Sequence, residues 1–92
     1  MRISVIGTGY VGLITGTGLA SKGHTVTCVD IDKEKVEKIN KGISPIFEEN
    51  LDEMLKKAIA KGNFNATLDI KNAIFNTELS FICVGTPSKD DG

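Results

Sequence analysis

Tryptophan is absent from the 92-residue sequence, tyrosine occurs once, and proline and cysteine occur twice each. Eleven basic against twelve acidic residues give a formal net charge of −1, so the chain lacks the excess positive charge that holds a nucleic-acid backbone. It also lacks an unbroken apolar run of about 20 residues, the length that crosses a membrane. We therefore expect neither nucleic acid nor a membrane as a partner.

The two cysteines, Cys28 and Cys83, are too few for a disulfide framework and lack the spacing of a zinc site, so no metal is expected. Each lies in an apolar, strand-like run, which predicts small buried residues, with a catalytic thiol as the alternative. On the second and fourth strands of one sheet they would lie roughly 9.6 Å apart, beyond the disulfide limit of about 7 Å. Reduced cysteines and no signal-peptide pattern predict a cytoplasmic protein.

The short length limits the architecture. A chain of 92 residues is sized for one domain with a single thin core. It ends in a polar run, residues 88–92, that carries no strand or helix signal and is typical of a loop. We therefore expect a fragment of a longer protein.

Glycine, by contrast, occurs ten times, and strand-like and helix-like segments alternate between the glycines. Strands are predicted over residues 2–6, 25–29, 66–68 and 79–84, and helices over residues 10–22 and 33–41, between Pro45 and Gly62, and over 69–75. The last strand is an apolar run of the kind buried on both faces of a sheet. The order β-α-β-α-α-β-α-β predicts an α/β protein with a parallel sheet.

A glycine-rich turn follows the first predicted strand. Gly7-Thr8-Gly9-Tyr10-Val11-Gly12 matches G-x-G-x-x-G, a weak pattern alone, but here it leaves a strand, opens a helix and precedes a strand that ends at Asp30. Gly7 permits the turn, Gly9 leaves room for a pyrophosphate, and Gly12 lets the helix lie close on the sheet. The helix N-terminus attracts the phosphates. The context predicts a Rossmann-type dinucleotide-binding sheet with helices on both faces; a structural glycine turn is the alternative.

Asp30, at the end of the second predicted strand, selects the cofactor. Its carboxylate is expected to accept hydrogen bonds from the adenosine ribose and to repel the additional phosphate of NADP, so NAD is the predicted cofactor. The alternative is a solvated turn residue. Asp32 is expected to be a plain helix cap. Lys35, one helical turn further on, is within reach of the same ribose, although its spacing suits an ordinary exposed lysine equally well.

The end of the fourth predicted strand is expected to face the same crevice. In a doubly wound sheet the first and fourth strands adjoin, and ligands lie beyond their carboxyl ends. The residues there are Val84-Gly85-Thr86-Pro87. Gly85 allows close approach, and Thr86 offers a hydroxyl and an N–H to the cofactor.

These motifs together carry a resemblance. With Gly7-Thr8-Gly9-Tyr10-Val11-Gly12, Cys28-Val29-Asp30-Ile31-Asp32 and Lys35, Gly42-Ile43-Ser44-Pro45-Ile46-Phe47-Glu48, and Cys83-Val84-Gly85-Thr86-Pro87, the chain resembles the N-terminal NAD-binding domain of the UDP-glucose/GDP-mannose dehydrogenase family over its whole length. One departure is Glu48-Glu49-Asn50-Leu51, where members often have Glu-Pro-Gly-Leu. The resemblance implies that the cofactor is bound by Gly7, Gly9, Tyr10, Val11, Gly12, Asp30, Lys35 and Thr86.

The resemblance also implies an activity for the whole protein. Such an enzyme oxidises the C6 alcohol of UDP-glucose twice, to UDP-glucuronate, with two NAD and through a thiohemiacetal on a cysteine. Its catalytic residues belong to later segments, so residues 1–92 are expected to be a catalytically silent first part of the Rossmann domain, without the domains that bind the UDP-sugar. GDP-mannose or an N-acetylated UDP-sugar stays open as the substrate. A homo-oligomer is also expected, through the open edge of the fourth strand.

Two other functions share the first half of the pattern. A nucleotide-sensing regulatory domain of the potassium-transport type begins with the same strand, glycine motif, helix, strand and Asp. A dehydrogenase of the 3-hydroxyacid or 6-phosphogluconate type does so as well. The long amphipathic helix after Ser44-Pro45 and the turn at residues 84–87 weigh against both, because neither function accounts for them. Both are therefore the less favoured alternatives.

Overall fold

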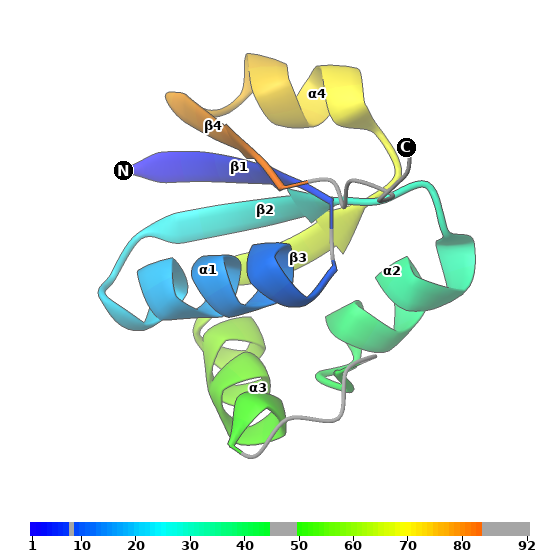
Figure 1. Cartoon of the computed structure of the whole chain (residues 1–92). Helices are drawn as coiled ribbons and strands as arrows, with labels where there is room; N and C mark the ends of the chain where they lie inside the picture. The colour runs from blue at the N-terminus through cyan, green and yellow to red at the C-terminus, as the bar shows by residue number, and fades with distance from the viewer. Residues whose placement is uncertain (8, 45–49, 84–92) are drawn as a thin grey trace.

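The computed structural model describes residues 1–7, 9–44 and 50–83 (Figure 1). The elements follow in the order β1 (Arg2–Ile6), α1 (Tyr10–Ser21), β2 (Thr25–Val29), α2 (Lys33–Asn40), α3 (Leu51–Lys61), β3 (Phe64–Thr67), α4 (Ile70–Phe75) and β4 (Leu79–Ile82). All strand pairs are parallel, and the order across the sheet is β3-β2-β1-β4. The predicted α/β parallel sheet is confirmed, and so is the adjacency of the first and fourth strands.

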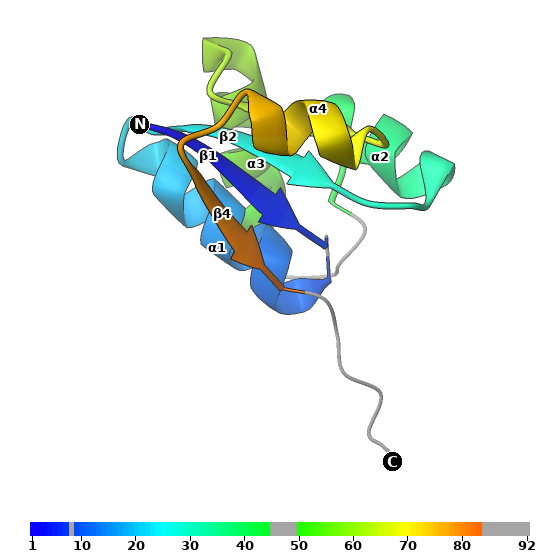
Figure 2. The same cartoon turned by 90° about the horizontal axis from the view of Figure 1, so that it is seen from above.

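Helices cover both faces of the sheet, as predicted. α1, α2 and α3 lie on one face, and α4 lies across β1 and β2 on the other (Figures 1 and 2). Along β1 the side chains alternate between these faces: Ile3 and Val5 enter the main core, whereas the Ser4 hydroxyl accepts a hydrogen bond from Thr77 Oγ1 at 3.0 Å, just after α4. Alternate residues of β1 therefore face the main core beneath α1, α2 and α3, and the smaller contact with α4 on the other face.

Small residues bring α1 close to the sheet. A Cβ added at Gly16 would lie 2.9 Å from the Phe64 ring and 3.3 Å from Cys28 Sγ, and Ala20, one turn later, is buried. These positions share one face of the helix, as the i, i+4 spacing predicts. Gly18 lies off this face, where an added Cβ would meet nothing within 4 Å, and nothing in the structure explains a glycine there.

The two edges of the sheet differ. At β3 the side chain of Asn40, the last residue of α2, takes the place of a further strand: its Nδ2 donates to the Ala66 carbonyl at 2.9 Å, and its Oδ1 accepts from the Ala66 N–H at 2.8 Å. The contact satisfies backbone groups at this edge of the sheet. Backbone groups left exposed on an edge strand would be available to pair with another chain.

The prediction that the fourth strand is buried on both faces is wrong. All four residues of β4 are exposed, and Ile82 is 75% exposed. In the described part of the chain β4 pairs with β1 alone, so it lies at the edge, where the helices cover it incompletely. The expected self-association through this edge stays a prediction. The predicted end of the strand, Val84, lies outside the described residues.

Smaller differences concern the third strand and the third helix. β3 starts at Phe64, two residues earlier than predicted, because Phe64 pairs with Val26 and its ring fills the core. α3 starts at Leu51; residues 45–49, which include Pro45, lie outside the described residues. Within α3 the side chains of Leu51, Leu55 and Ala58 are buried, whereas Met54 is 37% exposed.

Candidate cofactor site

The turn between β1 and α1 requires glycine at two positions. Gly7 has a φ of +105°, in the region that side chains disfavour, and its N–H donates to the Val29 carbonyl at 2.7 Å. A Cβ added at Gly12 would lie 2.1 Å from the carbonyl oxygen of Gly7 and 3.3 Å from the Cβ of Cys83. The helix can therefore start this close to the sheet only because Gly12 has no side chain.

Gly9 is different, because the folded chain does not itself need a glycine there. Its φ of −69° is accessible to any residue, and an added Cβ would meet no described residue within 4 Å. Gly9 is the N-cap of α1, and the first helical hydrogen bond runs from the Leu13 N–H to the Gly9 carbonyl at 2.9 Å. The first turn of α1 consists of Tyr10, Val11 and Gly12. Their backbone N–H groups come before the first helical hydrogen bond and are suited to bind an anion. Among the described residues, the space at Gly9 is thus open beside a helix end of the kind that suits an anion.

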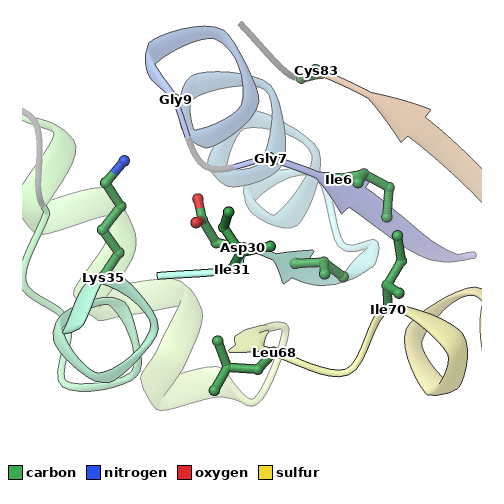
Figure 3. Close-up of a pocket in the computed structure, with 10 residues that line it drawn as sticks. Ile6, Gly7, Gly9, Asp30, Ile31, Lys35, Leu68, Ile70 and Cys83 are labelled. Atoms are coloured by element: carbon green, nitrogen blue, oxygen red, sulfur yellow. The ribbon is translucent and has the colours of Figure 1, made fainter. Parts of the chain in front are cut away.

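A cavity of about 460 Å³ opens next to this turn (Figure 3). The described residues that line it come from the carboxyl ends of all four strands and from the starts of three helices. The strand ends supply Ile6, Gly7, Val29, Asp30, Ile31, Leu68 and Cys83, and the helix starts supply Gly9, Lys35 and Ile70. The volume is within the range of small-molecule sites. Open α/β sheets bind their ligands at this place, beyond the carboxyl ends of the strands.

One end of the cavity carries charge. Asp30 follows β2, where its N–H donates to the Thr67 carbonyl at 3.2 Å, and its carboxylate turns toward the cavity. Lys35, in the first turn of α2, is half-buried, and Figure 3 shows its ammonium at the same end of the cavity as the Asp30 carboxylate. The structure brings together these two predicted ribose-binding residues, although five positions separate them in the chain.

The rest of the cavity is mostly apolar, which sequence analysis missed. Ile6, Leu68 and Ile70 line the part away from Lys35 (Figure 3). Leu68 directly follows β3 and Ile6 ends β1, so both stand at carboxyl ends of strands, where the fold places ligands. That position was the available signal. Together these side chains offer a surface for a flat, uncharged ring.

One predicted site residue lies outside the part of the chain that the structure describes. Thr86 lies outside the described residues, with the whole turn at residues 84–87. Thr8, inside the glycine motif, does so too. β4 nevertheless continues to the cavity, because the Cys83 N–H donates to the Ile6 carbonyl at 2.8 Å and Cys83 lines the wall.

The two cysteines are unpaired, as predicted, but their environments differ. Cys28 is fully buried, and its burial, with smaller contributions from Cys83 and Asp30, raises the pKa of the thiol to about 12. A buried thiol that stays protonated at neutral pH does not suit nucleophilic catalysis, because the nucleophile is the thiolate, so Cys28 is assigned to the core. Cys83 is half-buried rather than buried, since it follows the edge strand.

The buried thiol predicts a loss of stability in alkali. The Cys28 thiol has a pKa of about 12 in the folded chain, whereas its ordinary value is 9.0. The stabilisation that comes from burying the protonated thiol is therefore complete below pH 9 and is lost between pH 9 and 12. Urea unfolding at several pH values should show a steeper alkaline decline for the wild type than for Cys28→Ala. Parallel pH profiles of the two proteins would contradict the assignment.

Membrane spans and metal sites each require a recognisable group of residues. Within residues 1–7, 9–44 and 50–83, no helix is long and apolar enough to cross a membrane. The same residues contain no group of three or more His, Cys, Asp or Glu side chains that could hold a metal ion.

Comparison with known proteins gives consistent matches over the whole chain. The model of the UDP-glucose/GDP-mannose dehydrogenase family, NAD binding domain, matches residues 1–92. UDP-glucose 6-dehydrogenase YwqF of Bacillus subtilis is 50% identical over 92 residues, which are 100% of this chain and 21% of that protein. GDP-mannose 6-dehydrogenase of Pseudomonas syringae pv. tomato is also 50% identical, with the same coverage.

Solved structures agree in fold. The crystal structure of a ternary complex of GDP-mannose dehydrogenase from Pseudomonas aeruginosa superposes with a TM-score of 0.94 at 44% identity, covering 98% of this chain and 21% of that one. A UDP-glucose dehydrogenase from Pyrobaculum islandicum gives a TM-score of 0.92 at 36% identity, with the same coverage. The chain thus spans about a fifth of the length of the relatives it matches.

Proposed function

The chain belongs to the UDP-glucose/GDP-mannose dehydrogenase family as its NAD-binding domain, and from this premise we propose that it is the cofactor-binding part of a nucleotide-sugar dehydrogenase. The observation that carries the proposal is the cavity at the carboxyl ends of the strands, with open space at Gly9 and with Asp30 and Lys35 at one end. The potassium-transport, 3-hydroxyacid and 6-phosphogluconate alternatives are not favoured, because the family match extends over all 92 residues.

In this proposal the NAD pyrophosphate lies on the N-terminus of α1. Gly9 leaves the space for it, and Tyr10, Val11 and Gly12 present N–H groups toward it. No cationic side chain is needed in the turn, because the helix end itself favours an anion. Gly7 acts indirectly, by allowing the tight turn, and Gly12 also allows the helix to lie against the sheet.

The adenosine half of NAD takes the rest of the cavity. Asp30 accepts hydrogen bonds from the ribose hydroxyls, and Lys35 donates to the same ribose. The adenine ring lies against Leu68 and Ile70, whose apolar side chains suit its flat face. Thr86 is assigned to the cofactor as well, on its motif alone. A 2′-phosphate would place its negative charge against the Asp30 carboxylate, which favours NAD over NADP.

Replacing Asp30 tests this assignment directly. Asp30→Ala removes the acceptor of the ribose hydroxyls, so NAD binding should weaken by about 1 to 3 kcal/mol. Asp30→Asn retains one oxygen acceptor and removes the charge; it should lose less NAD affinity and gain affinity for NADP. Calorimetric titration of both variants with both cofactors measures this. Unchanged NAD affinity in Asp30→Ala would rule out the ribose contact.

For the whole protein we propose oxidation of the C6 alcohol of a nucleotide sugar to the carboxylate, with two NAD reduced. UDP-glucose is the proposed substrate, supported by the identity to a UDP-glucose 6-dehydrogenase; GDP-mannose is the second candidate, supported by an equal identity. In this proposal residues 1–92 contribute no catalytic group and no sugar contact. The catalytic residues and the sugar-binding domains are assigned to the part of the enzyme that corresponds to the rest of the relatives' length. A cytoplasmic location is part of the proposal, supported by the unpaired cysteines.

The substrate is decided by product analysis on the full-length enzyme. With UDP-glucose and excess NAD we expect two NADH per sugar and UDP-glucuronate as the product, because each oxidation step of the alcohol transfers one hydride. The matched reaction with GDP-mannose should be at least tenfold slower at equal concentration. A faster reaction with GDP-mannose would reverse the choice of substrate and leave the cofactor assignment in place.

A further inference from the structure

A residue outside the cavity holds the two charged residues that line it. The backbone N–H of Asp32 donates to Asp30 Oδ1 at 2.9 Å. The carboxylate of the same Asp32 accepts from the N–H of Glu34 at 3.0 Å and of Lys35 at 3.4 Å. Asp32 is exposed and does not line the cavity. Its backbone thus contacts one ribose-site residue and its side chain contacts the other.

These contacts depend on one another. By capping α2, the Asp32 carboxylate holds its own backbone at a φ of −90° and a ψ of 109°. That conformation sets the direction in which the Asp32 N–H points, and this N–H contributes to the orientation of the Asp30 carboxylate that accepts from it. The same cap fixes where α2 begins, and Lys35 is in its first turn. Figure 3 shows the outcome, with both charged groups at one end of the cavity.

We propose that Asp32 is a positioning residue of the cofactor site, which orients Asp30 and places Lys35 without touching the cofactor. This inference rests on the proposed function, since it assumes that Asp30 and Lys35 bind the adenosine ribose. A preoriented carboxylate loses less conformational freedom on binding and meets a 2′-phosphate at a defined place. Asp32 therefore contributes both to NAD affinity and to the preference for NAD over NADP.

The test measures both quantities, in calorimetric titrations of NAD and NADP. Asp32→Ala, which removes the cap, should lower NAD affinity at least fivefold and reduce the ratio of NAD to NADP affinity by a similar factor. Asp32→Asn and Asp32→Ser retain a capping oxygen and should restore both to within twofold of the wild type. Asp32→Gly is the substitute if the alanine variant does not fold, because glycine is tolerated at N-caps.

Asp69→Ala is the matched control for the loss of a helix cap. Asp69 caps α4 through the Asn72 N–H at 3.0 Å, at the start of a different helix from the one that carries Lys35, so the cofactor ratio should stay as in the wild type. The inference is overturned if Asp32→Ala keeps the wild-type ratio, or if Asp69→Ala changes it equally. If the wild type itself shows no preference for NAD, the proposed function fails and the inference fails with it.

Discussion

Gly12→Ala is expected to destabilise the domain by about 3 kcal/mol or more, or to prevent folding. The added Cβ would lie 2.1 Å from the backbone carbonyl oxygen of Gly7. Gly7 is itself held in place, because its N–H donates to the Val29 carbonyl. No flexible side chain is available to move aside, so α1 would have to shift away from β1. Urea unfolding of the variant and the wild type measures the difference.

Gly18→Ala is the control for this substitution. It also places alanine inside α1, but its Cβ would lie within 4 Å of no residue in the described ranges. Because alanine is the better helix former, the variant should be more stable than the wild type by about 0.5 to 1 kcal/mol. If the free energies of unfolding of Gly12→Ala and Gly18→Ala differ by less than about 1 kcal/mol, the close packing of α1 on the sheet is contradicted.

Gly9→Ala is expected to have the opposite profile, with a folded protein that no longer binds NAD well. The φ of −69° and the open space around the position allow alanine, so stability should fall by no more than about 1 kcal/mol, the cost of a poorer N-cap. The new methyl group would occupy the space assigned to the pyrophosphate and separate it from the N–H groups of α1. NAD affinity should therefore fall at least tenfold, which is about 1.4 kcal/mol.

Stability and affinity must be measured on the same protein for this prediction. Thermal unfolding shows whether Gly9→Ala is folded, and titration with NAD shows whether it binds. Gly18→Ala again serves as the control, since it should bind NAD like the wild type. A folded Gly9→Ala protein with wild-type affinity would show that the pyrophosphate does not lie at the start of α1.

Local patterns in the sequence were sufficient for most of the fold. The glycine face of α1, which includes Gly12 and Gly16, follows from the spacing of small residues, and Asp32 and Asp69 mark the starts of α2 and α4 as capping residues do. The start of α3 was less predictable: Asn50 adopts a φ of +70° and makes no side-chain cap. Nothing in the residue type required that conformation.

The errors concern properties that depend on neighbours far away in the chain. The apolar composition of β4 predicts burial, but burial is decided by what lies beyond the strand, and β4 is an edge strand in the described residues. The same edge position leaves Cys83 half-buried at the cavity. Leu68 and Ile70 were missed because no motif marks them, and only the topology brings them to the carboxyl ends of the other strands.

The central claim is that this chain binds NAD through the start of α1 and through Asp30. Calorimetric titration of the 92-residue chain with NAD and, separately, with NADP tests it most directly. We predict binding of NAD, with NADP at least tenfold weaker, a gap of about 1.4 kcal/mol. Equal affinity for the two cofactors would contradict the role of Asp30, and the absence of any binding of NAD would contradict the site as a whole.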